Sequence, residues 1–220
     1  MKTGVILCNG EFPKKEYPLY LLRSADVLIC CDSARNPLRL KKLGLEPTLI
    51  VGDLDSTPAR LRAEYSDRLI KIEEQDDNDL AKAFAVMRRR FPEVGTIHIL
   101  GAGGRSEAHT VGNLGWLMEW ERRALAKGGS LLKEGVSVDM VSDYGTAFAI
   151  SQSAELEVGE GRKISFFSAD PTLRIHSEGL EWRLDEVDLS LWWAATLNRA
   201  SAERIKLSFN HPAPLLIILD

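Results

Sequence analysis

Short apolar runs alternate with longer segments of helical periodicity along the first two-thirds of the chain. The apolar runs predict strands at 4–8, 26–31, 48–52, 68–72, 96–100 and 136–141. The segments between them predict helices near 17–24, 34–43, 57–65, 79–91 and 109–126. A start for the helix near 57–65 is also visible, because Ser56 can cap it and Pro58 suits its first turn. This alternation is typical of an α/β domain with a mainly parallel, Rossmann-like sheet.

The pattern changes after about residue 144. Short strand-like runs follow there, separated by Gly, Asp, Pro and Asn, and the sequence has no helical periodicity. The runs lie at 146–150, 154–158, 162–168, 173–177, 204–209 and 214–219. They predict a small all-β sandwich. We therefore expect an α/β domain over residues 1–144 and a β-sandwich domain over residues 145–220.

Composition narrows the class of protein without assigning a function. The 28 basic and 32 acidic residues give a net charge of −4, which provides no general attraction for nucleic acid or an anionic membrane. No apolar run approaches the roughly 20 residues of a membrane span, and polar residues follow the apolar start too soon for a signal peptide. Cys8, Cys30 and Cys31 lie in or beside apolar runs, so we expect buried free thiols, as in a reducing cytoplasm.

Small, acidic or amide residues follow successive predicted strands. They are Asn9 and Gly10, then Asp32 and Ser33, then the stretches 52–56, 73–82 and 101–113. In an open parallel sheet, ligands bind beyond the carboxyl ends of the strands. We therefore expect these residues to gather at one edge of the sheet.

That edge would be rich in carboxylates, namely Asp32, Asp53, Asp55, Asp76, Asp77 and Asp79. Crowded carboxylates repel one another unless a cation joins them, and oxygen ligands suit Mg²⁺. Asp53 and Asp55 point the same way if the chain stays extended there. Asp76 and Asp79 would share a face as the next helix begins, with Lys82 one turn further along. The pattern predicts a Mg²⁺-dependent enzyme that acts on a polyphosphate.

Each motif taken alone also has an ordinary structural explanation. "GDLDS" at 52–56 can be a turn with a helix cap, and the acids at 76–79 can favour the positive end of a helix. The glycine loop "GAGGRSEAHTVGN" at 101–113 matches neither G-x-G-x-x-G nor a Walker sequence. Within it, Arg105 can be a solvated charge and His109 a packing residue. Their position at consecutive strand ends is what favours a functional site.

These blocks resemble the thiamine pyrophosphokinase family in order and spacing. The N-terminal blocks are "ILCNGEFP", "CCDSARNPLRLKKLGLEPTLIVGDLDS", "QDDNDLAKAF" and "GAGGRSEAHTVGNL", and the C-terminal ones are "GRKISFF", "EGLEWRL" and "WWAATLN". The resemblance implies transfer of a diphosphate from ATP to the hydroxyl of thiamine, with release of AMP. It also implies a C-terminal β-sandwich, and a homodimer with active sites at the interface.

The resemblance further implies roles for individual residues. Asp53, Asp55 and Asp79 would hold Mg²⁺ and the ATP phosphates, and His109 would join them as a catalytic residue. Nucleotide and phosphate contacts would come from Asn9, Asp32, Ser33, Asp76, Lys82, Gly103, Gly104, Arg105 and Asn113. Thiamine contacts would come from Trp192, Trp193, Thr196 and Asn198. Because adjacent residues of a strand point to opposite faces, we expect one of the two tryptophans to lie in the core.

Position 108 departs from the family pattern, which has an aspartate before the histidine. Ala108 can neither ligate a metal nor accept a proton, and Glu107 would point about 100° away on a helix. Two alternatives to an active thiamine diphosphokinase therefore remain. One is a catalytically impaired member that still binds thiamine or nucleotide, and the other is a diphosphokinase for a different alcohol.

Overall fold

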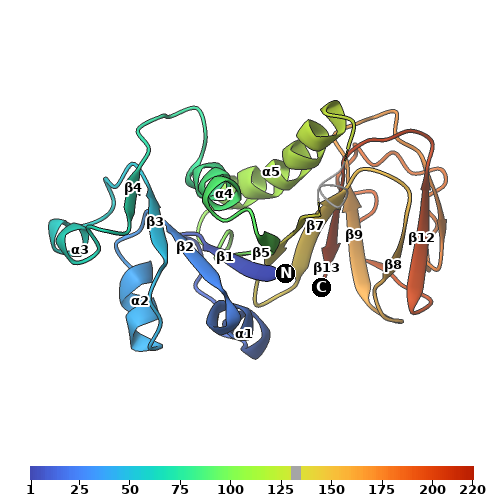
Figure 1. Cartoon of the computed structure of the whole chain (residues 1–220). Coiled ribbons are helices and arrows are strands. Elements are labelled where there is room, and N and C mark those ends of the chain that lie inside the picture. The colour runs from blue at the N-terminus through green and yellow to red at the C-terminus, as the bar shows by residue number, and fades with distance from the viewer. Residues whose placement is uncertain (130–134) are drawn as a thin grey trace. The chain divides into compact units, whose positions relative to one another are not determined.

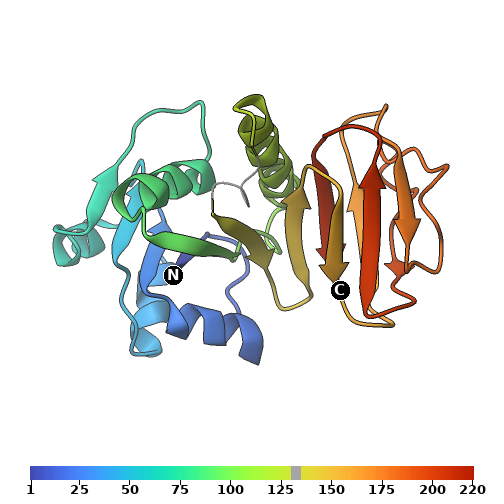
Figure 2. The ribbon, with the colours of Figure 1, turned by 45° about the vertical axis from the view of Figure 1, so that its right-hand side comes forward.

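The computed structural model describes residues 1–129 and 135–220, which form two compact units. The first unit contains residues 1–113 and 135–143, and the second contains residues 114–129 and 144–220. Helix α5 (Glu107–Ala126) begins in the first unit and ends in the second. Figures 1 and 2 follow the chain through these elements.

The described part of the first unit contains a parallel sheet with the order β6-β5-β1-β2-β3-β4. Its strands are β1 (Lys2–Leu7), β2 (Val27–Cys31), β3 (Leu49–Gly52), β4 (Leu69–Lys71), β5 (Val94–Leu100) and β6 (Ser137–Val141). The chain builds the sheet outward from β1 to β4 and then returns to place β5 on the other side of β1. The order therefore reverses between β1 and β5, which opens a crevice at their carboxyl ends.

Helices cover both faces of this sheet (Figure 1). They are α1 (Glu16–Ser24), α2 (Asn36–Lys42), α3 (Ala59–Glu64) and α4 (Asp79–Arg90), together with the start of α5. Leu22 of α1 and Leu40 of α2 share an apolar core with Val5. Gly4, the residue before Val5, faces the other side of β1. Met87 of α4 packs against it there. The predicted parallel α/β architecture is confirmed.

The start of α3 differs from the prediction. The helix begins at Ala59, and Pro58 is its N-cap residue with no side-chain hydrogen bond. Ser56 does not cap the helix, because it lies two residues before the N-cap position, and its backbone N–H donates to the Asp32 carboxylate at 2.9 Å. The 52–57 segment is therefore a turn tied to β2.

The described part of the second unit contains two antiparallel sheets, with orders β11-β9-β13-β7 and β10-β12-β8. Their strands are β7 (Thr146–Ile150), β8 (Ala154–Glu157), β9 (Lys163–Phe167), β10 (Ile175–Glu178), β11 (Asn198–Arg199), β12 (Arg204–Phe209) and β13 (Leu215–Leu219). Phe166 and Ile217 of one sheet and Ile175, Ile205 and Leu207 of the other belong to one buried apolar cluster. The predicted β-sandwich is confirmed, and β11 is the strand that the sequence pattern did not reveal.

The three cysteines are free and buried, as predicted. Within residues 1–129 and 135–220, no helix combines the length and the apolar character that crossing a membrane requires.

Candidate functional site

A cavity of about 580 Å³ lies at the carboxyl ends of β1 and β5, where the strand order reverses. Its walls come from the segments that follow β1, β2, β3, β4 and β5 and from the start of α5. This is the place where open α/β sheets bind ligands. The predicted site residues that line it are Asn9, Asp32, Asp79, Gly103, Arg105, His109 and Asn113.

The glycine loop after β5 is paired, backbone to backbone, with the segment after β1. The N–H of Gly10 donates to the carbonyl of Gly101 at 2.6 Å, and the N–H of Glu11 donates to the carbonyl of Gly103 at 2.7 Å. Gly101 has a φ of 64°, and a Cβ there would lie 2.8 Å from the Cys8 carbonyl oxygen. Glycine therefore lets these two backbones meet at the cavity wall.

Arg105 is held beside the cavity by Asn9. Its Nη1 donates to the backbone carbonyl of Asn9 at 2.8 Å and to the side-chain oxygen of Asn9 at 3.2 Å. The Ser33 hydroxyl donates to the same side-chain oxygen at 3.0 Å. Ser33 is fully buried and is not part of the cavity wall, so its role in the structure is to orient Asn9. The result is a cation fixed next to the glycine loop.

Asp32 is buried at the end of β2 and organises the turn after β3. Its carboxylate accepts hydrogen bonds from the backbone N–H of Ser56 and from the Thr57 hydroxyl. Gly52 permits this approach, because a Cβ at that position would lie 2.5 Å from the Asp32 Cβ. Asp32 therefore both lines the cavity and fixes the neighbouring turn.

The 52–56 turn is not extended, so the condition under which Asp53 and Asp55 would point the same way is not met. Leu54 adopts a left-handed φ of 67°, so the alternation of an extended chain does not apply across it. The N–H of Asp55 folds back to donate to the Asp53 carboxylate at 3.1 Å, which is the main cause of a lowered pKa at Asp53. Asp53 is half-buried, whereas Asp55 is exposed.

Asp79 is an acid of this site whose environment disfavours the ionised form. It begins α4 and lines the cavity. Burial raises the pKa of Asp79, and the negative charges of Asp32 and Asp53 raise it further. Lys82 and His109 lower the pKa of Asp79 in part. The pKa of Asp79 therefore reflects its burial first and the neighbouring carboxylates second.

Lys82 and Asp76 flank Asp79 in different ways. Lys82 lies one turn further along α4, and it is buried outside the cavity wall. Asp76 precedes the helix, and its N–H is bound by the side chain of Glu74. The expectation that Asp76 and Asp79 share a helical face is wrong, because α4 begins only at Asp79.

Asn78 lines the cavity and was not predicted as a site residue. Its side-chain oxygen caps α4 by accepting from the N–H of Ala81 at 2.9 Å, and its amide donates to the Asn113 side chain at 3.2 Å. The Asn113 amide in turn donates to the carbonyl of Ala102 at 2.8 Å. This chain of contacts joins α4, α5 and the glycine loop. An asparagine directly before a periodic apolar helix is an N-cap signal that could have identified it.

The start of α5 places His109 in the cavity wall, together with Asn113 one turn further on. The backbone N–H of His109 donates to the Ser106 hydroxyl at 3.3 Å. Ala108 is exposed and does not belong to the cavity wall. Gly104 is also exposed, and a Cβ there would lie 2.7 Å from that of Glu11.

The carboxylates fit a hydrated divalent cation better than an enclosed one. In the part of the chain that the structure describes, no three acidic, histidine or cysteine side chains are grouped closely enough to hold a metal ion. Mg²⁺ does not need such a cage, because it keeps several waters and takes one or two carboxylates plus substrate phosphates. The burial of Asp79 and its proximity to Asp32 and Asp53 both disfavour its ionised form, which a bound cation would stabilise.

In the second unit, the two adjacent tryptophans lie in a turn between β10 and β11, not in a strand. Trp192 is 39% exposed and Trp193 is 74% exposed, so the expectation that one of them belongs to the core is wrong. Trp192 is anchored, because its Nε1–H donates to the Ser168 carbonyl at 3.1 Å and its ring packs edge-on to Phe167. Trp193 keeps a free face, and its carbonyl accepts from the Thr196 hydroxyl at 3.1 Å.

The side chain of Asn198 is hydrogen-bonded to backbone groups of its own domain. It is buried, and its amide donates to the Trp182 carbonyl at 2.7 Å. Its side-chain oxygen accepts from the backbone N–H groups of Trp182 and Arg199. These contacts shape the segment that carries the tryptophans.

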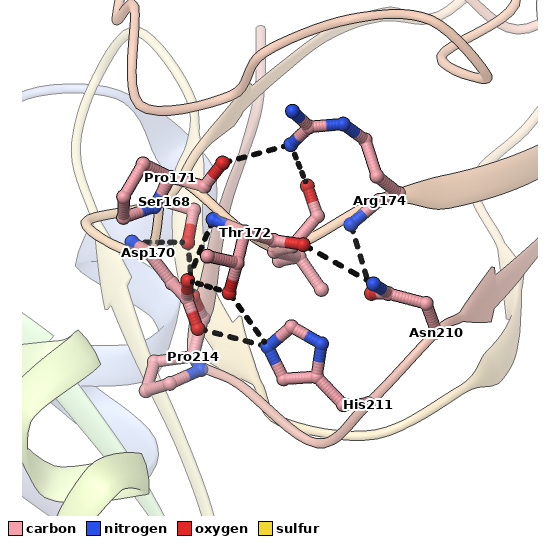
Figure 3. Close-up of polar contacts among 9 residues, drawn as sticks. Ser168, Asp170, Pro171, Thr172, Arg174, Asn210, His211 and Pro214 are labelled. Atoms are coloured by element: carbon pink, nitrogen blue, oxygen red, sulfur yellow. Dashed lines mark hydrogen bonds and ion pairs between the residues drawn. The ribbon is translucent and has the colours of Figure 1, made fainter.

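The loop that holds Trp192 is braced by a polar network (Figure 3). Asp170 accepts from the N–H and hydroxyl of Thr172 at 2.8 and 2.6 Å, and pairs with His211 Nε2 at 2.9 Å. His211 and Thr172 together lower the pKa of Asp170 to about 2. Ser168 joins the network by donating to the Pro214 carbonyl at 3.0 Å. The carbonyl that receives Trp192 is therefore part of a fixed loop.

A parallel sheet with a polar cavity at its switch point, in a chain that also carries an antiparallel sandwich, defines a two-part α/β protein that binds its ligand at the carboxyl edge of the sheet. A thiamin pyrophosphokinase catalytic-domain model matches residues 19–126, and a thiamin pyrophosphokinase substrate-binding-domain model matches residues 145–212. The chain belongs to the thiamin pyrophosphokinase family. No curated protein sequence matches it.

Solved structures share the fold at low identity. Thiamine pyrophosphokinase from Bacillus subtilis superposes with a TM-score of 0.73 and 18% identity, covering 100% of this chain and 99% of that one. The Candida albicans enzyme gives 0.75 and 14%, with 99% and 90% covered. The yeast enzyme gives 0.75 and 15%, with 100% and 86% covered. At these identities the likeness establishes the fold.

Proposed function

We propose that the strand-end cavity is the ATP site of a thiamine diphosphokinase, which transfers the diphosphate of ATP to the thiamine hydroxyl and releases AMP. The observation that carries this proposal is the meeting of acids and cations in one cavity at the switch point of the sheet. Asp32 and Asp79 line it together with Arg105 and His109. Membership of the thiamin pyrophosphokinase family supports the assignment.

The phosphates of ATP would lie along the glycine loop. Gly103 and Arg105 line the cavity there, and Arg105 would offset the charge on the phosphate oxygens. Gly104 would contribute through its backbone between them. Asn9 would contact the nucleotide directly, with Ser33 holding it in place. Asn113 would support the loop from α5 through its contact with Ala102.

Mg²⁺ would be held by Asp53 and Asp79 together with phosphate oxygens and water. Bound there, the ion would offset negative charge on the transferred group. Asp55 and Asp76 are exposed and would reach such an ion only through water. Lys82 would limit the repulsion between the acids, since its charge lowers the pKa of both Asp53 and Asp79.

The reaction would be an in-line displacement at the β-phosphorus of ATP. The thiamine hydroxyl oxygen forms a bond to that phosphorus, and the bond to the oxygen bridging the α- and β-phosphates breaks. AMP leaves with the bridging oxygen. Arg105 and His109 stabilise negative charge as it moves, and a cavity carboxylate accepts the hydroxyl proton.

Thiamine would be recognised by the second unit. Trp193 has a free face that suits a cationic aromatic ligand, and anchored Trp192 gives a second, less exposed ring. Thr196 lies in the same turn, and Asn198 would act by shaping it. Family membership supports a homodimer with shared sites, and free buried thiols support a cytoplasmic location.

The test is to incubate the purified chain with ATP, Mg²⁺ and thiamine and to measure thiamine diphosphate and AMP. Equal amounts of the two products are expected. An Ala108→Asp variant is run in parallel. Turnover by the variant alone would instead identify an impaired family member, and no turnover by either would overturn the thiamine assignment. Replacing thiamine with other primary alcohols tests a different acceptor.

Individual roles are tested with a matched pair of acids. Asp79→Asn is expected to lower kcat at least about 100-fold, because it removes the carboxylate that faces the transferred charge. Asp77 lies two residues earlier, at an exposed position, and Asp77→Asn is expected to change kcat less than about threefold. Equal effects of the two substitutions would refute the role of Asp79.

A further inference from the structure

Two of the three cysteines meet at the cavity wall. The Sγ atoms of Cys8 and Cys31 lie 3.7 Å apart, and both residues line the cavity. Cys31 also contacts the backbone carbonyl of Asp79, with 3.5 Å between Sγ and the oxygen. The pair therefore sits at the start of α4, beside the residue proposed to face the phosphates.

The register of the parallel strands brings these two cysteines opposite each other. Leu7 of β1 pairs with Cys30 of β2, so the next pair along the two strands is Cys8 and Cys31. Residues at the same register of neighbouring strands point to the same face and have Cα atoms about 4.8 Å apart. A disulfide needs Cα atoms about 4.4–6.8 Å apart. The backbone thus already has the spacing that a disulfide requires.

We propose that Cys8 and Cys31 form an oxidation site, which a peroxide converts to an intramolecular disulfide within the folded protein. Cys8 is the more exposed of the two, at 6% against 1%, and it attacks first. Its sulfur takes one peroxide oxygen as the O–O bond breaks, which gives a sulfenic acid and one water. The Cys31 sulfur then attacks the sulfenic sulfur, the S–S bond forms and a second water leaves. The two thiols lose two protons and two electrons, and the peroxide is reduced.

Closing the bond would change the cavity wall. The two sulfurs must move from 3.7 Å to about 2.05 Å, and rotation of the two side chains supplies this movement because the backbone spacing already suits a disulfide. Cys31 would leave its contact with the Asp79 carbonyl. Oxidation is therefore expected to lower turnover at least tenfold and reduction to restore it, an effect that rests on the proposed function.

Cys30 provides an internal control. It lies in the same strand as Cys31, β2, but points to the opposite face, where it belongs to the apolar core with Leu28 and Leu40. It is fully buried and does not line the cavity. A reaction that depends on the cavity and on the strand register should leave this thiol reduced.

The experiment exposes the native chain to hydrogen peroxide at millimolar concentration and maps cysteine linkages by mass spectrometry after alkylation. The contact with Cys8 and the burial of the side chain raise the pKa of the Cys31 thiol, so the reaction is followed over hours. A Cys8–Cys31 peptide 2 Da lighter than its reduced form, with Cys30 alkylated, is the expected result. The same linkage should form in Cys30→Ala and be absent in Cys31→Ala.

Circular dichroism recorded before mapping verifies that the chain is still folded. The proposal would be overturned if Cys8 and Cys31 were both still reduced in the folded, peroxide-treated chain. A linkage that includes Cys30 would also overturn it. The mapping of the unsubstituted chain decides this even where a variant fails to fold. Linkage without loss of turnover would overturn the effect on the cavity, provided that the reduced chain is active in the diphosphate-transfer assay.

Discussion

Gly10→Ala tests whether the glycine loop and the segment after β1 form one structural unit. A Cβ at position 10 would lie 2.3 Å from the carbonyl oxygen of Gly101 and 2.4 Å from that of Gly103. Both contacts are far inside van der Waals distance, and both partners are backbone atoms that cannot move aside as a side chain can. The two backbones must therefore separate.

The expected loss of stability follows from two contributions. Forcing an extra methyl group into a packed position costs about 1–3 kcal/mol. Separation also weakens the hydrogen bonds from Gly10 to Gly101 and from Glu11 to Gly103, at about 1 kcal/mol each. We expect a decrease of about 3–5 kcal/mol in the free energy of unfolding, or roughly 6–20 °C in Tm.

Function should fall more steeply than stability. Arg105 is held at the cavity by the backbone and side chain of Asn9, which directly precedes Gly10. A shift of this segment moves the cation away from its position beside the glycine loop. We expect kcat/KM for ATP to fall at least about 100-fold at temperatures where the variant is still folded.

Gly112→Ala is the matched control, because it adds the same methyl group in the same half of the protein. Nothing lies within 4 Å of a Cβ at position 112, which is on the exposed side of α5. Alanine is the better helix former, so this variant should be more stable by about 0.5–1 kcal/mol. The assay is urea unfolding followed by circular dichroism, with steady-state kinetics on the same preparations. The reasoning would be refuted if Gly10→Ala had the same free energy of unfolding and kcat/KM as the unsubstituted chain. It would also be refuted if Gly112→Ala lost as much stability and activity as Gly10→Ala.

Asn78→Ala should lower the free energy of unfolding by about 1 kcal/mol through loss of the α4 cap, and it should raise KM for ATP. Asn78→Ser should recover the stability. Urea titration measures the stability and steady-state kinetics measure KM. The Asp170 carboxylate has a folded pKa of about 2, so the stability that it provides is complete above its ordinary value of 3.8 and is lost as the pH falls through 2. Asp170→Asn should therefore cost about 1 kcal/mol at pH 7, allowing for its partial exposure, and almost nothing at pH 2 in the same urea titration. Trp193→Ala should raise KM for thiamine about tenfold with little change in stability, and an unchanged KM would contradict its proposed contact. Chelation by EDTA should stop turnover and added Mg²⁺ should restore it, which a coupled AMP assay can follow.

Much of the fold could be predicted because its local signals agree with one another. Apolar runs of strand length alternate with amphipathic segments such as α4, whose Leu80, Phe84 and Met87 are all buried. That alternation restricts the first unit to a parallel sheet with crossover helices. The change to short strands after about residue 144 likewise predicted the sandwich, since no helical period competes with the strand pattern there.

The site was harder to predict wherever a turn controls a side chain. The left-handed φ at Leu54 and the late start of α4 separate Asp53 from Asp55 and leave Asp76 outside the helix. Neither feature can be derived from residue spacing, because each depends on hydrogen bonds to groups elsewhere in the fold. Asp32 ties down the 52–57 turn from another strand, and Asn78 joins α4 to Asn113 of α5.

The sequence by itself determined which residues reach the carboxyl edge of the sheet, because each polar segment directly follows an apolar strand. Only the tertiary structure decided which of them share a cavity. That choice depends on the reversal of strand order between β1 and β5, which places segments almost a hundred residues apart in contact. Local propensities act over a few residues, whereas strand order is set by packing of the whole sheet, and the meeting of Asn9 with Arg105 and of Cys8 with Cys31 belongs to that second level.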